Sequence, residues 1–309
     1  MKKNVVLCVL CCLLLCAACA APTESTADKN AYYTFTDSTG VAVTLHNKPQ
    51  NCAVLFSSFA EIWTLAGGEI AVTVGETVER GFAEQGTLLA DLGAGKSVDT
   101  EMLLTSQVDF VIASADIPAQ VQVVSFLRKQ GIACALFSVE SFADYLTVLQ
   151  VCTDILENPS AYETYGTNVR EQTEDLLAEN TGEPQDILFI RSGSSASSAK
   201  AKTAQTHFAA AMLKELGTRN IAEEAGILTE TLSAEEILLR DPDRIFICTM
   251  GDETAARSYM QTVLQTDAWQ QLTAVAKGRV YFLPKDLFQY KPNHRWADAY
   301  AYLLHCLQA

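Results

Sequence analysis

The sequence predicts an α/β protein with two lobes that are joined by one long helix. Two observations lead to this prediction. Short apolar segments alternate with segments of helical periodicity in both halves of the chain, and a central stretch is helical without any strand. Apolar segments that lack polar alternation are typical of parallel strands covered by helices on both faces. With 309 residues, 49% of them hydrophobic, the chain is large enough for two such lobes.

The N-terminal residues predict a signal peptide. Lys2 and Lys3 form a short basic region, and the apolar segment from Val5 to Leu15 is too short to span a bilayer. We expect residues 1–18 to be removed from the mature protein.

The CAAC stretch that follows matches a bacterial lipoprotein signal. The small residues Ala17 and Ala18 precede Cys19, which would be lipidated and become the first mature residue. Cys16 stands where a leucine is usual. We therefore expect a lipid on Cys19 and a flexible tether over residues 19–30. A redox role for CVLC or CAAC is the alternative interpretation of the same cysteines.

The first lobe is expected over residues 31–158. It begins with YYTFTDSTGVAVTL, whose alternation around a turn at Asp37 predicts a β-hairpin. The remaining segments predict four strands and four helices. The strands are expected at 52–56, 71–75, 109–114 and 133–138, and the helices near 58–67, 99–106, 118–130 and 141–157.

Residues 159–181 predict the helix that joins the lobes. Asn158 is a good N-cap, Pro159 suits the first turn, and Gly182 ends the segment. A helix of about 20 residues is about 30 Å long, which is enough to reach from one lobe to the other.

The α/β pattern then starts again over residues 182–309, the second lobe. No sequence repeat relates the two lobes. The strands are expected at 186–191, 244–249 and 279–284, and the helices near 204–216, 233–240, 253–265 and 293–307.

The charge of the chain argues against two classes of partner. The formal net charge is -15, and it becomes about -17 once Lys2 and Lys3 are removed. No basic stripe is present to neutralise phosphates, so we do not expect nucleic acid binding. The same charge argues against loose electrostatic adhesion to anionic lipid, so we expect membrane contact through the lipid anchor only.

Five of the ten cysteines lie beyond the signal segment. Their odd number and their spacing suggest neither a disulfide framework nor a zinc site. We expect them to be small buried hydrophobic residues, and their redox state stays open. They are Cys52, Cys134, Cys152, Cys248 and Cys306.

The sequence offers little to an enzyme. LADLGAGKS (89–97) nearly matches a phosphate-binding loop, but Ala90 stands where the pattern requires glycine, and no strand directly precedes it. GxSxG, HExxH and GxGxxG are absent, and only four histidines are present. We expect no catalytic activity, no resident cofactor and no metal site.

Six loops are expected to follow the carboxyl ends of the predicted strands, three in each lobe. In open α/β sheets this is where ligands bind. The loop RSGSSASSAKAK contains small residues that let a ligand approach the backbone, and Arg191, Lys200 and Lys202 add charge; a plain surface loop is the alternative. The six loops are residues 57–61, 75–81, 114–118, 191–202, 249–253 and 284–296.

The order of several segments resembles a known family. A lipoprotein signal is followed by FTDSTGVAVTL, AVLFSSFAEIWTLAGG, VDTEMLLTSQVDFVIAS, LSAEEILLRDPDRIFI and KGRVYFLP. Together they are similar to the substrate-binding lipoproteins of iron-siderophore, haem and cobalamin ABC importers, the class III periplasmic binding proteins. The resemblance covers roughly residues 30–305, although no single motif is diagnostic.

The resemblance implies two rigid Rossmann-like α/β lobes, a ligand cleft between them and modest closure. It also implies a protein that is lipid-anchored at the outer face of the bacterial cytoplasmic membrane and delivers its ligand to an ABC permease, whose ATPase subunit supplies the energy. We expect a monomer without enzymatic activity.

Two glutamates stand at matching places in the segments 97–114 and 231–249. Glu101 and Glu235 each lie early in a predicted helix, where a carboxylate stabilises the helix by about 0.3–1 kcal/mol. The resemblance implies a second role, pairing with arginines of the permease, one glutamate from each lobe. Glu236 is a neighbour that this argument does not exclude.

A ferric siderophore is the leading hypothesis for the ligand. Guanidinium groups suit an anionic chelate, and aromatic rings supply flat apolar contacts. For each arginine the alternative is an ordinary surface charge, and for Trp296 it is core packing. The candidate contacts are Ser57, Phe59, Arg80, Arg191, Tyr290, Arg295 and Trp296.

Haem and cobalamin are the alternative ligands. Haem would need an axial ligand, for which His294, Tyr290 or Met250 are candidates. A surface lipoprotein with a purely structural role and no ligand is the alternative of another class.

Overall fold

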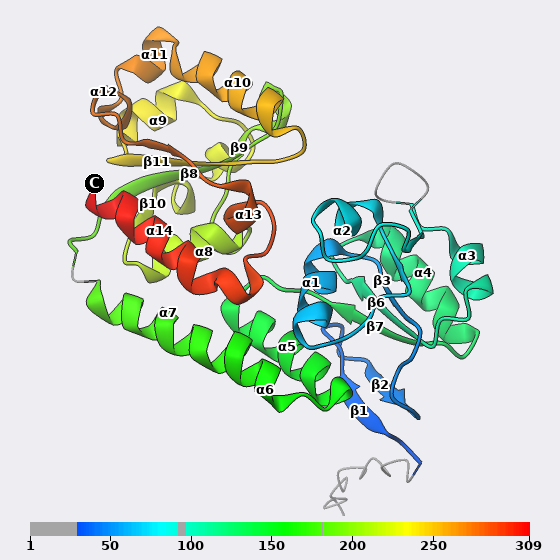
Figure 1. Cartoon of the computed structure of the whole chain (residues 1–309). Coiled ribbons are helices and arrows are strands. Elements are labelled where there is room, and N and C mark those ends of the chain that lie inside the picture. Colours follow the sequence, from blue (N-terminus) through cyan, green and yellow to red (C-terminus); the bar gives the residue numbers. More distant parts are fainter. Residues whose placement is uncertain (1–29, 92–96, 181) are drawn as a thin grey trace, which may run out of the picture. The chain divides into compact units, whose positions relative to one another are not determined.

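The computed structural model describes residues 30–91, 97–180 and 182–309 (Figure 1). The chain begins with the predicted hairpin, in which β1 (Tyr33–Thr36) pairs antiparallel with β2 (Ala42–Leu45). Asp37 fixes the turn by accepting hydrogen bonds from the backbone of Thr39 at 2.9 Å and Val41 at 3.1 Å. The prediction of this hairpin is confirmed.

The first sheet is parallel, with the strand order β5-β4-β3-β6-β7. All four predicted strands are present. The two-residue strand β5, both of whose residues are exposed, was not predicted. The strands are β3 (Cys52–Val54), β4 (Val72–Thr73), β5 (Leu88–Leu89), β6 (Phe110–Ser114) and β7 (Ala133–Phe137).

Helices cover both faces of the first sheet, as the apolar strands predict. Apolar side chains of α1 and α5 pack on one face, and those of α3 and α4 pack on the other. We call this sheet and its helices the first lobe. The helices are α1 (Ser57–Leu65), α2 (Gly75–Glu79), α3 (Thr100–Thr105), α4 (Pro118–Lys129) and α5 (Phe142–Leu156).

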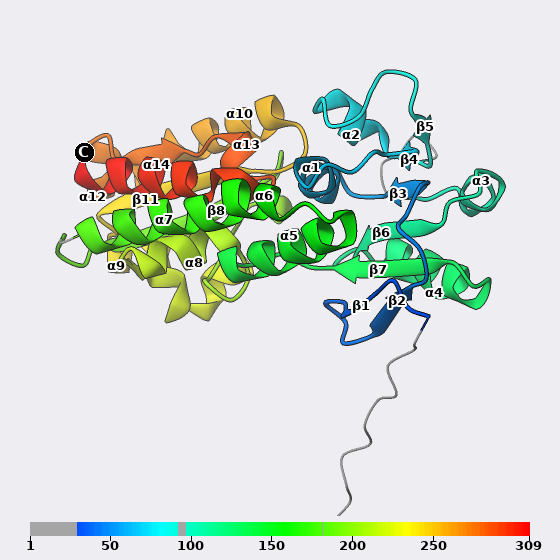
Figure 2. The same cartoon turned by 60° about the horizontal axis from the view of Figure 1, so that its bottom comes forward.

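The central helix is continuous but not α-helical throughout. It consists of α6 (Pro159–Tyr162), the π-helical turn η1 (Glu163–Thr167) and α7 (Asn168–Glu179). The Tyr145 hydroxyl of α5 donates a hydrogen bond of 2.8 Å to the Tyr165 carbonyl within the π turn. Its first part, α6 and η1, packs on α5, and its second part, α7, packs on the C-terminal helix α14 (Trp296–Gln308) (Figure 2).

The second sheet has the strand order β10-β8-β11-β12, and these four strands are parallel. The segment 191–202 was expected to be a loop, which is wrong in part: β9 pairs antiparallel with β8 and closes a hairpin. The strands are β8 (Asp186–Ser192), β9 (Lys200–Ala201), β10 (Arg219–Asn220), β11 (Arg244–Thr249) and β12 (Val280–Phe282).

The helices of the second lobe also cover both faces of its sheet. Side chains of α8 and α14 pack on one face, and those of α9, α10 and α11 pack on the other. The α/β class is therefore confirmed in both halves of the chain. These helices are α8 (Phe208–Glu215), α9 (Ala234–Arg240), α10 (Glu253–Leu264), α11 (Asp267–Gln270), α12 (Thr273–Ala276), α13 (Lys285–Phe288) and α14 (Trp296–Gln308); the 3₁₀ turns are η2 (Ala196–Ser198), η3 (Ile221–Glu223), η4 (Gly226–Thr229) and η5 (Asn293–Arg295).

The five cysteines of the described chain are buried, as expected, and all five are free thiols. Burial raises the pKa of Cys134 and Cys248 to about 12. In residues 30–91, 97–180 and 182–309, no helix has both the length and the apolar character needed to cross a membrane.

Candidate ligand-binding cleft

A cavity of about 660 Å³ lies where the strands of both sheets end. Its lining comes from the segments after β3, β4, β5 and β6 in the first lobe and after β8, β11 and β12 in the second. We call this cavity the cleft. It lies at the carboxyl ends of parallel strands, where α/β sheets usually bind ligands, and where the sequence predicts them.

The first-lobe wall of the cleft is apolar with two carboxylates. Leu55, Phe56, Val74 and Ile117 supply the apolar part; Gln120 joins them and is held by its own hydrogen bonds. One carboxylate comes from α2, which follows β4, and the other from the segment after β5.

Glu76 and Asp91 are those carboxylates, and each is oriented by one donor. Glu76 accepts a hydrogen bond from the Ser57 hydroxyl. Asp91 accepts one from the backbone N–H of Gly75 at 3.0 Å. Both side chains are half-buried and line the cleft.

The second-lobe wall is built from small and polar residues. Gly193 is required there, because a Cβ at this position would lie 2.5 Å from Ser198 Oγ. Asp252 caps α10 by accepting from the Ala255 N–H at 3.0 Å. The rest of the wall consists of Arg191, Ser194, Met250, Gly251, Gln289 and Tyr290.

Two polar groups of this wall have no partner. Arg191 is exposed, and its guanidinium makes no hydrogen bond or ion pair with any residue that the structure describes. The Oε1 atom of Gln289 is buried and likewise lacks a hydrogen-bond partner within the described chain. The cleft thus offers the uncommitted guanidinium of Arg191 to a ligand, whereas the Gln289 oxygen is buried beneath its lining.

A second, strongly charged cavity of about 570 Å³ adjoins the cleft at Tyr290, which lines both. Acidic and basic side chains of both lobes line it. Its lining consists of Glu61, Glu79, Arg80, Phe82, Lys285, Asp286, Tyr290, Pro292, His294 and Arg295.

Arg80 lines this second cavity and is already engaged. Its guanidinium is 3.5 Å from the Glu61 carboxylate and donates to the Ser57 hydroxyl at 3.0 Å. It stacks on the rings of Tyr290 at 4.0 Å and Phe82 at 4.7 Å. An anionic ligand would therefore compete with Glu61 for this arginine.

Three residues of the segment after α13 contact the first lobe. Lys291 Nζ lies 2.7 Å from Glu140 Oε1. Asn293, which is buried at a φ of 52°, donates from Nδ2 to the Ser58 carbonyl and to Glu61, both at 2.9 Å. The His294 Nδ1 atom lies 3.2 Å from Glu61 Oε1.

The structure divides the candidate ligand contacts into three groups. Arg191, Tyr290 and the haem-ligand candidate Met250 line the cleft. Arg80, Arg295 and His294 line the second cavity, where Arg295 pairs with Asp298 at 3.3 Å. The three arginines thus do not converge on one cavity.

Ser57, Phe59 and Trp296 form the third group, which is buried. The Phe59 ring packs against Phe56 and Phe137, and Ser57 orients Glu76 and Arg80. Trp296, which is 1% exposed, packs against other rings of the core, so the structure shows the core-packing alternative. Neither cavity is lined by any of these three residues. Their role as ligand contacts stays a prediction, and the cavities do not support it.

Sequence reasoning singled out only Arg191, Met250 and Tyr290 of the cleft lining, and four of the polar residues that it missed are instructive. Asp252 and Glu76 lie in loops that the sequence indicates, but the residue type alone did not single them out. Asp91 follows the unpredicted strand β5, and Gln289 follows the one-turn helix α13. No periodic signal can reveal elements of two to four residues.

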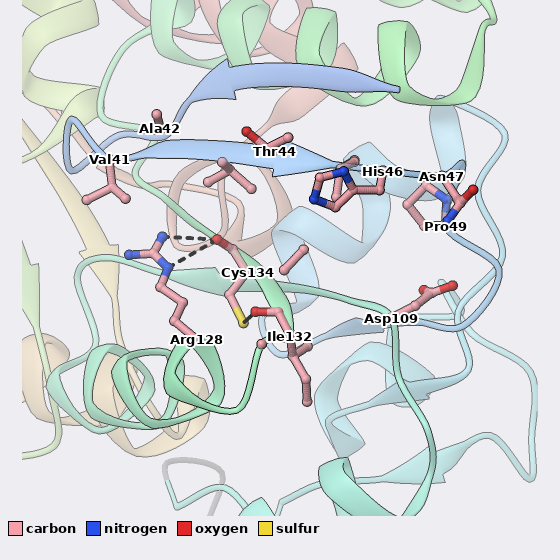
Figure 3. Close-up of a pocket in the computed structure, with 14 residues that line it drawn as sticks. Val41, Ala42, Thr44, His46, Asn47, Pro49, Asp109, Arg128, Ile132 and Cys134 are labelled. Atoms are coloured by element: carbon pink, nitrogen blue, oxygen red, sulfur yellow. Dashed lines mark hydrogen bonds between the residues drawn. The ribbon is translucent and has the colours of Figure 1, made fainter. Parts of the chain in front are cut away.

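A third cavity, of about 410 Å³, lies between β2 and the end of α4 (Figure 3). Two of its charged side chains have structural partners. Arg128 donates to the Cys134 carbonyl at 3.0 Å, and Asp109 accepts from the backbone N–H groups of Gln50 and Asn51. Asp109 and Cys134 stand at the amino ends of the parallel strands β6 and β7, opposite the carboxyl ends that form the cleft, so we do not assign the ligand to this cavity.

Glu101 on α3 and Glu235 on α9 are exposed, and neither carboxylate has a hydrogen-bond or ion-pair partner in the described chain. Glu236, by contrast, pairs with Arg240 at 2.7 Å. The predicted lipidation site Cys19 and most of the glycine-rich stretch after Asp91 lie outside the described residues.

The family model for periplasmic binding proteins matches residues 52–287. No curated protein matches the chain in sequence. Similar solved structures include the periplasmic vitamin B12 binding protein BtuF of Vibrio cholerae, with 18% identity, coverage of 84% of this chain and 97% of that one, and a TM-score of 0.65.

Two further structures are similar in the same way. The siderophore binding protein BauB, bound to two molecules of acinetobactin and ferric iron, is 15% identical with a TM-score of 0.70, and the match covers 89% of this chain and 97% of that one. S. aureus IsdE, complexed with heme, is 12% identical with a TM-score of 0.67 and coverages of 83% and 99%. At these identities the likeness establishes a shared fold.

Proposed function

This chain belongs to the periplasmic binding protein family, and from that premise we propose that it is the substrate-binding lipoprotein of an ABC importer. It captures a ferric siderophore outside the bacterial cytoplasmic membrane, is held there by lipid on Cys19, and passes the ligand to the permease. The observation that carries the proposal is the cleft of about 660 Å³ at the carboxyl ends of both sheets.

The contents of the cleft support a bulky polar ligand. Arg191 and Tyr290 face it from the second lobe, and apolar side chains cover the first-lobe wall. BauB, whose fold this chain shares, binds a ferric siderophore. Met250 and Tyr290 also line the cleft and are the residues that would serve haem as axial ligands, so haem is the second candidate.

Ligand binding is tested with the soluble domain from Thr23 onward. All three tryptophans, Trp63, Trp269 and Trp296, are buried in the described chain, so a coloured iron chelate quenches them by energy transfer without direct contact. We expect quenching by at least one ferric siderophore with a Kd below about 1 μM, a typical threshold for specific capture.

Haemin and cobalamin are titrated in parallel. A Soret band with haemin that is lost in Met250→Ala or Tyr290→Ala would replace the siderophore with haem, and tight binding of cobalamin alone would replace it with that ligand. If none of the three classes binds, the proposed uptake function is wrong and a ligand-free surface lipoprotein is favoured.

Docking to the permease is assigned to the exposed carboxylates of Glu101 and Glu235. We expect the double variant Glu101→Lys and Glu235→Lys to abolish iron uptake in cells, because it turns attraction to permease arginines into repulsion. Binding by the purified domain should be unchanged. Glu69→Lys, at another exposed glutamate, is the control and should transport normally. Loss of ligand binding in the double variant would contradict the docking assignment.

A further inference from the structure

The charges that line the cleft differ from those that an anionic chelate would need. Glu76, Asp91 and Asp252 contribute three carboxylates, and Arg191 contributes the one guanidinium, so the lining carries a formal charge of -2. The cleft is therefore acidic, although the sequence drew attention to arginines.

The other two arginines do not change this balance. Arg80 pairs with Glu61, and Arg295 pairs with Asp298. Both line the second cavity and not the cleft. Lys200 lies beside Arg191 in the β8–β9 hairpin, but it does not line the cleft and is 3.8 Å from Glu230.

The three carboxylates are held in place by the protein itself. Each accepts one hydrogen bond from a neighbouring hydroxyl or backbone N–H group, and a carboxylate has room for further donors. All three residues line the cleft. A ligand that carries ammonium or N–H donors satisfies these groups, whereas an anionic ligand leaves them facing like charge.

We propose that the cleft selects a ferric chelate of zero or positive net charge, with a terminal ammonium directed toward Glu76, Asp91 and Asp252. This inference rests on the proposed function and adds the charge class of the ligand. Three hydroxamate groups cancel the charge of ferric iron, so a trihydroxamate with an amine tail is singly positive. Three catecholates leave a strongly negative complex, which the cleft disfavours. Arg191 donates to the chelating oxygens, which remain electron-rich in either class.

The experiment varies only the charge of the ligand. Ferrioxamine B is a trihydroxamate with a free amine; its N-acetyl derivative is neutral and its N-succinyl derivative is negative, with the same iron core. We expect calorimetric affinities to fall in that order, by about tenfold from the positive to the negative member, because the lining repels anions. Added salt should weaken the positive member most, since it screens the attraction.

Variants of the lining separate charge from shape. Asp252→Asn preserves the cap of α10 and Glu76→Gln preserves the acceptor for Ser57, and each should reduce the preference for the positive over the negative member. Glu79→Gln removes a carboxylate that lines the second cavity only, and it should leave the preference unchanged.

The outcomes separate a failure of the proposed charge class from a failure of the proposed siderophore uptake. Tighter binding of the succinylated member or of a tris-catecholate overturns the charge class but leaves the uptake of a siderophore standing. A preference that persists in both lining variants also overturns it. Binding of no siderophore at all overturns the proposed ligand, and the charge class fails with it.

Discussion

His207 shows how one buried residue makes the fold depend on pH. Its Nδ1 atom accepts a hydrogen bond of 3.2 Å from the Ala209 N–H and so caps α8, and its ring lies 4.8 Å from that of Phe189. Burial, helped by the nearby cations Arg191, Lys291 and Lys202, lowers the pKa of His207 to about 3. The folded protein therefore holds this imidazole neutral.

The free energy of unfolding should fall as the pH falls from about 6.5 toward about 3. In this window the unfolded chain binds a proton at residue 207 that the folded chain does not, so acid favours unfolding by up to about 1.4 kcal/mol per pH unit. His207→Asn keeps a capping acceptor but cannot titrate, so urea unfolding from pH 4 to 7 should show a shallower slope in this variant. Equal slopes in both proteins would show that His207 is not the group responsible.

The π turn in the central helix is the clearest departure at the level of elements. The apolar stripe of residues 159–181 predicts an α-helix, because one widened turn hardly shifts a 3.6-residue pattern. In the structure the turn at Glu163–Thr167 brings Gly166 close to α5, where a Cβ would lie 3.3 Å from Leu149. The buried Tyr145 hydroxyl supplies the donor that the turn uses.

Tyr145→Phe should lower the free energy of unfolding by about 1–2 kcal/mol. The variant keeps the ring in its core site and leaves the Tyr165 carbonyl without its donor. Tyr259→Phe is the control, because the Tyr259 hydroxyl has no hydrogen-bond partner in the described chain. Urea denaturation measures both; an equal effect in the two variants would contradict a special role for the π turn.

Much of the fold was predictable because its main strands are long apolar segments. Strands such as β6, β8 and β11 are almost wholly buried, so their sequences carry a strong signal. β5, β9 and β10 contain two residues each, too few for any periodicity. The long strands also located the loops of the site, because each loop follows a strand. The individual side chains that line the cleft were not predictable, because they are positioned by one-turn helices such as α2 and α13, which are too short to leave a pattern in the sequence.

At the scale of the whole molecule, partners distant in sequence decide what the charged residues do. Arg80 is engaged by Glu61 and by Tyr290, which follows it by more than 200 positions. No local pattern reveals such a pairing, and so the sequence could not show that Arg80 and Arg191 line different cavities. The same loop ties the lobes together through Lys291 and Asn293.

Those ties predict a modest change on ligand binding. We expect X-ray scattering curves of the soluble domain to differ little with and without ligand.

Asn293→Gly keeps the positive φ but removes two buried hydrogen bonds between the lobes. It should therefore lower the free energy of unfolding by about 1–3 kcal/mol and increase the radius of gyration of the ligand-free protein. Gln107→Gly, at a φ of 54° on the first-lobe surface, is the control. A large closure of the unaltered protein would contradict this prediction.

The buried cysteines have a practical consequence for measuring that closure. Thiol reagents attack thiolates, and burial keeps the native thiols protonated and out of reach. In the soluble domain, cysteines introduced by Leu104→Cys and Leu239→Cys would sit at exposed positions, one in each lobe. A pair of fluorescent dyes could then be attached at these two places alone, and single-molecule energy transfer would follow the distance between the lobes while the native cysteines stay unlabelled.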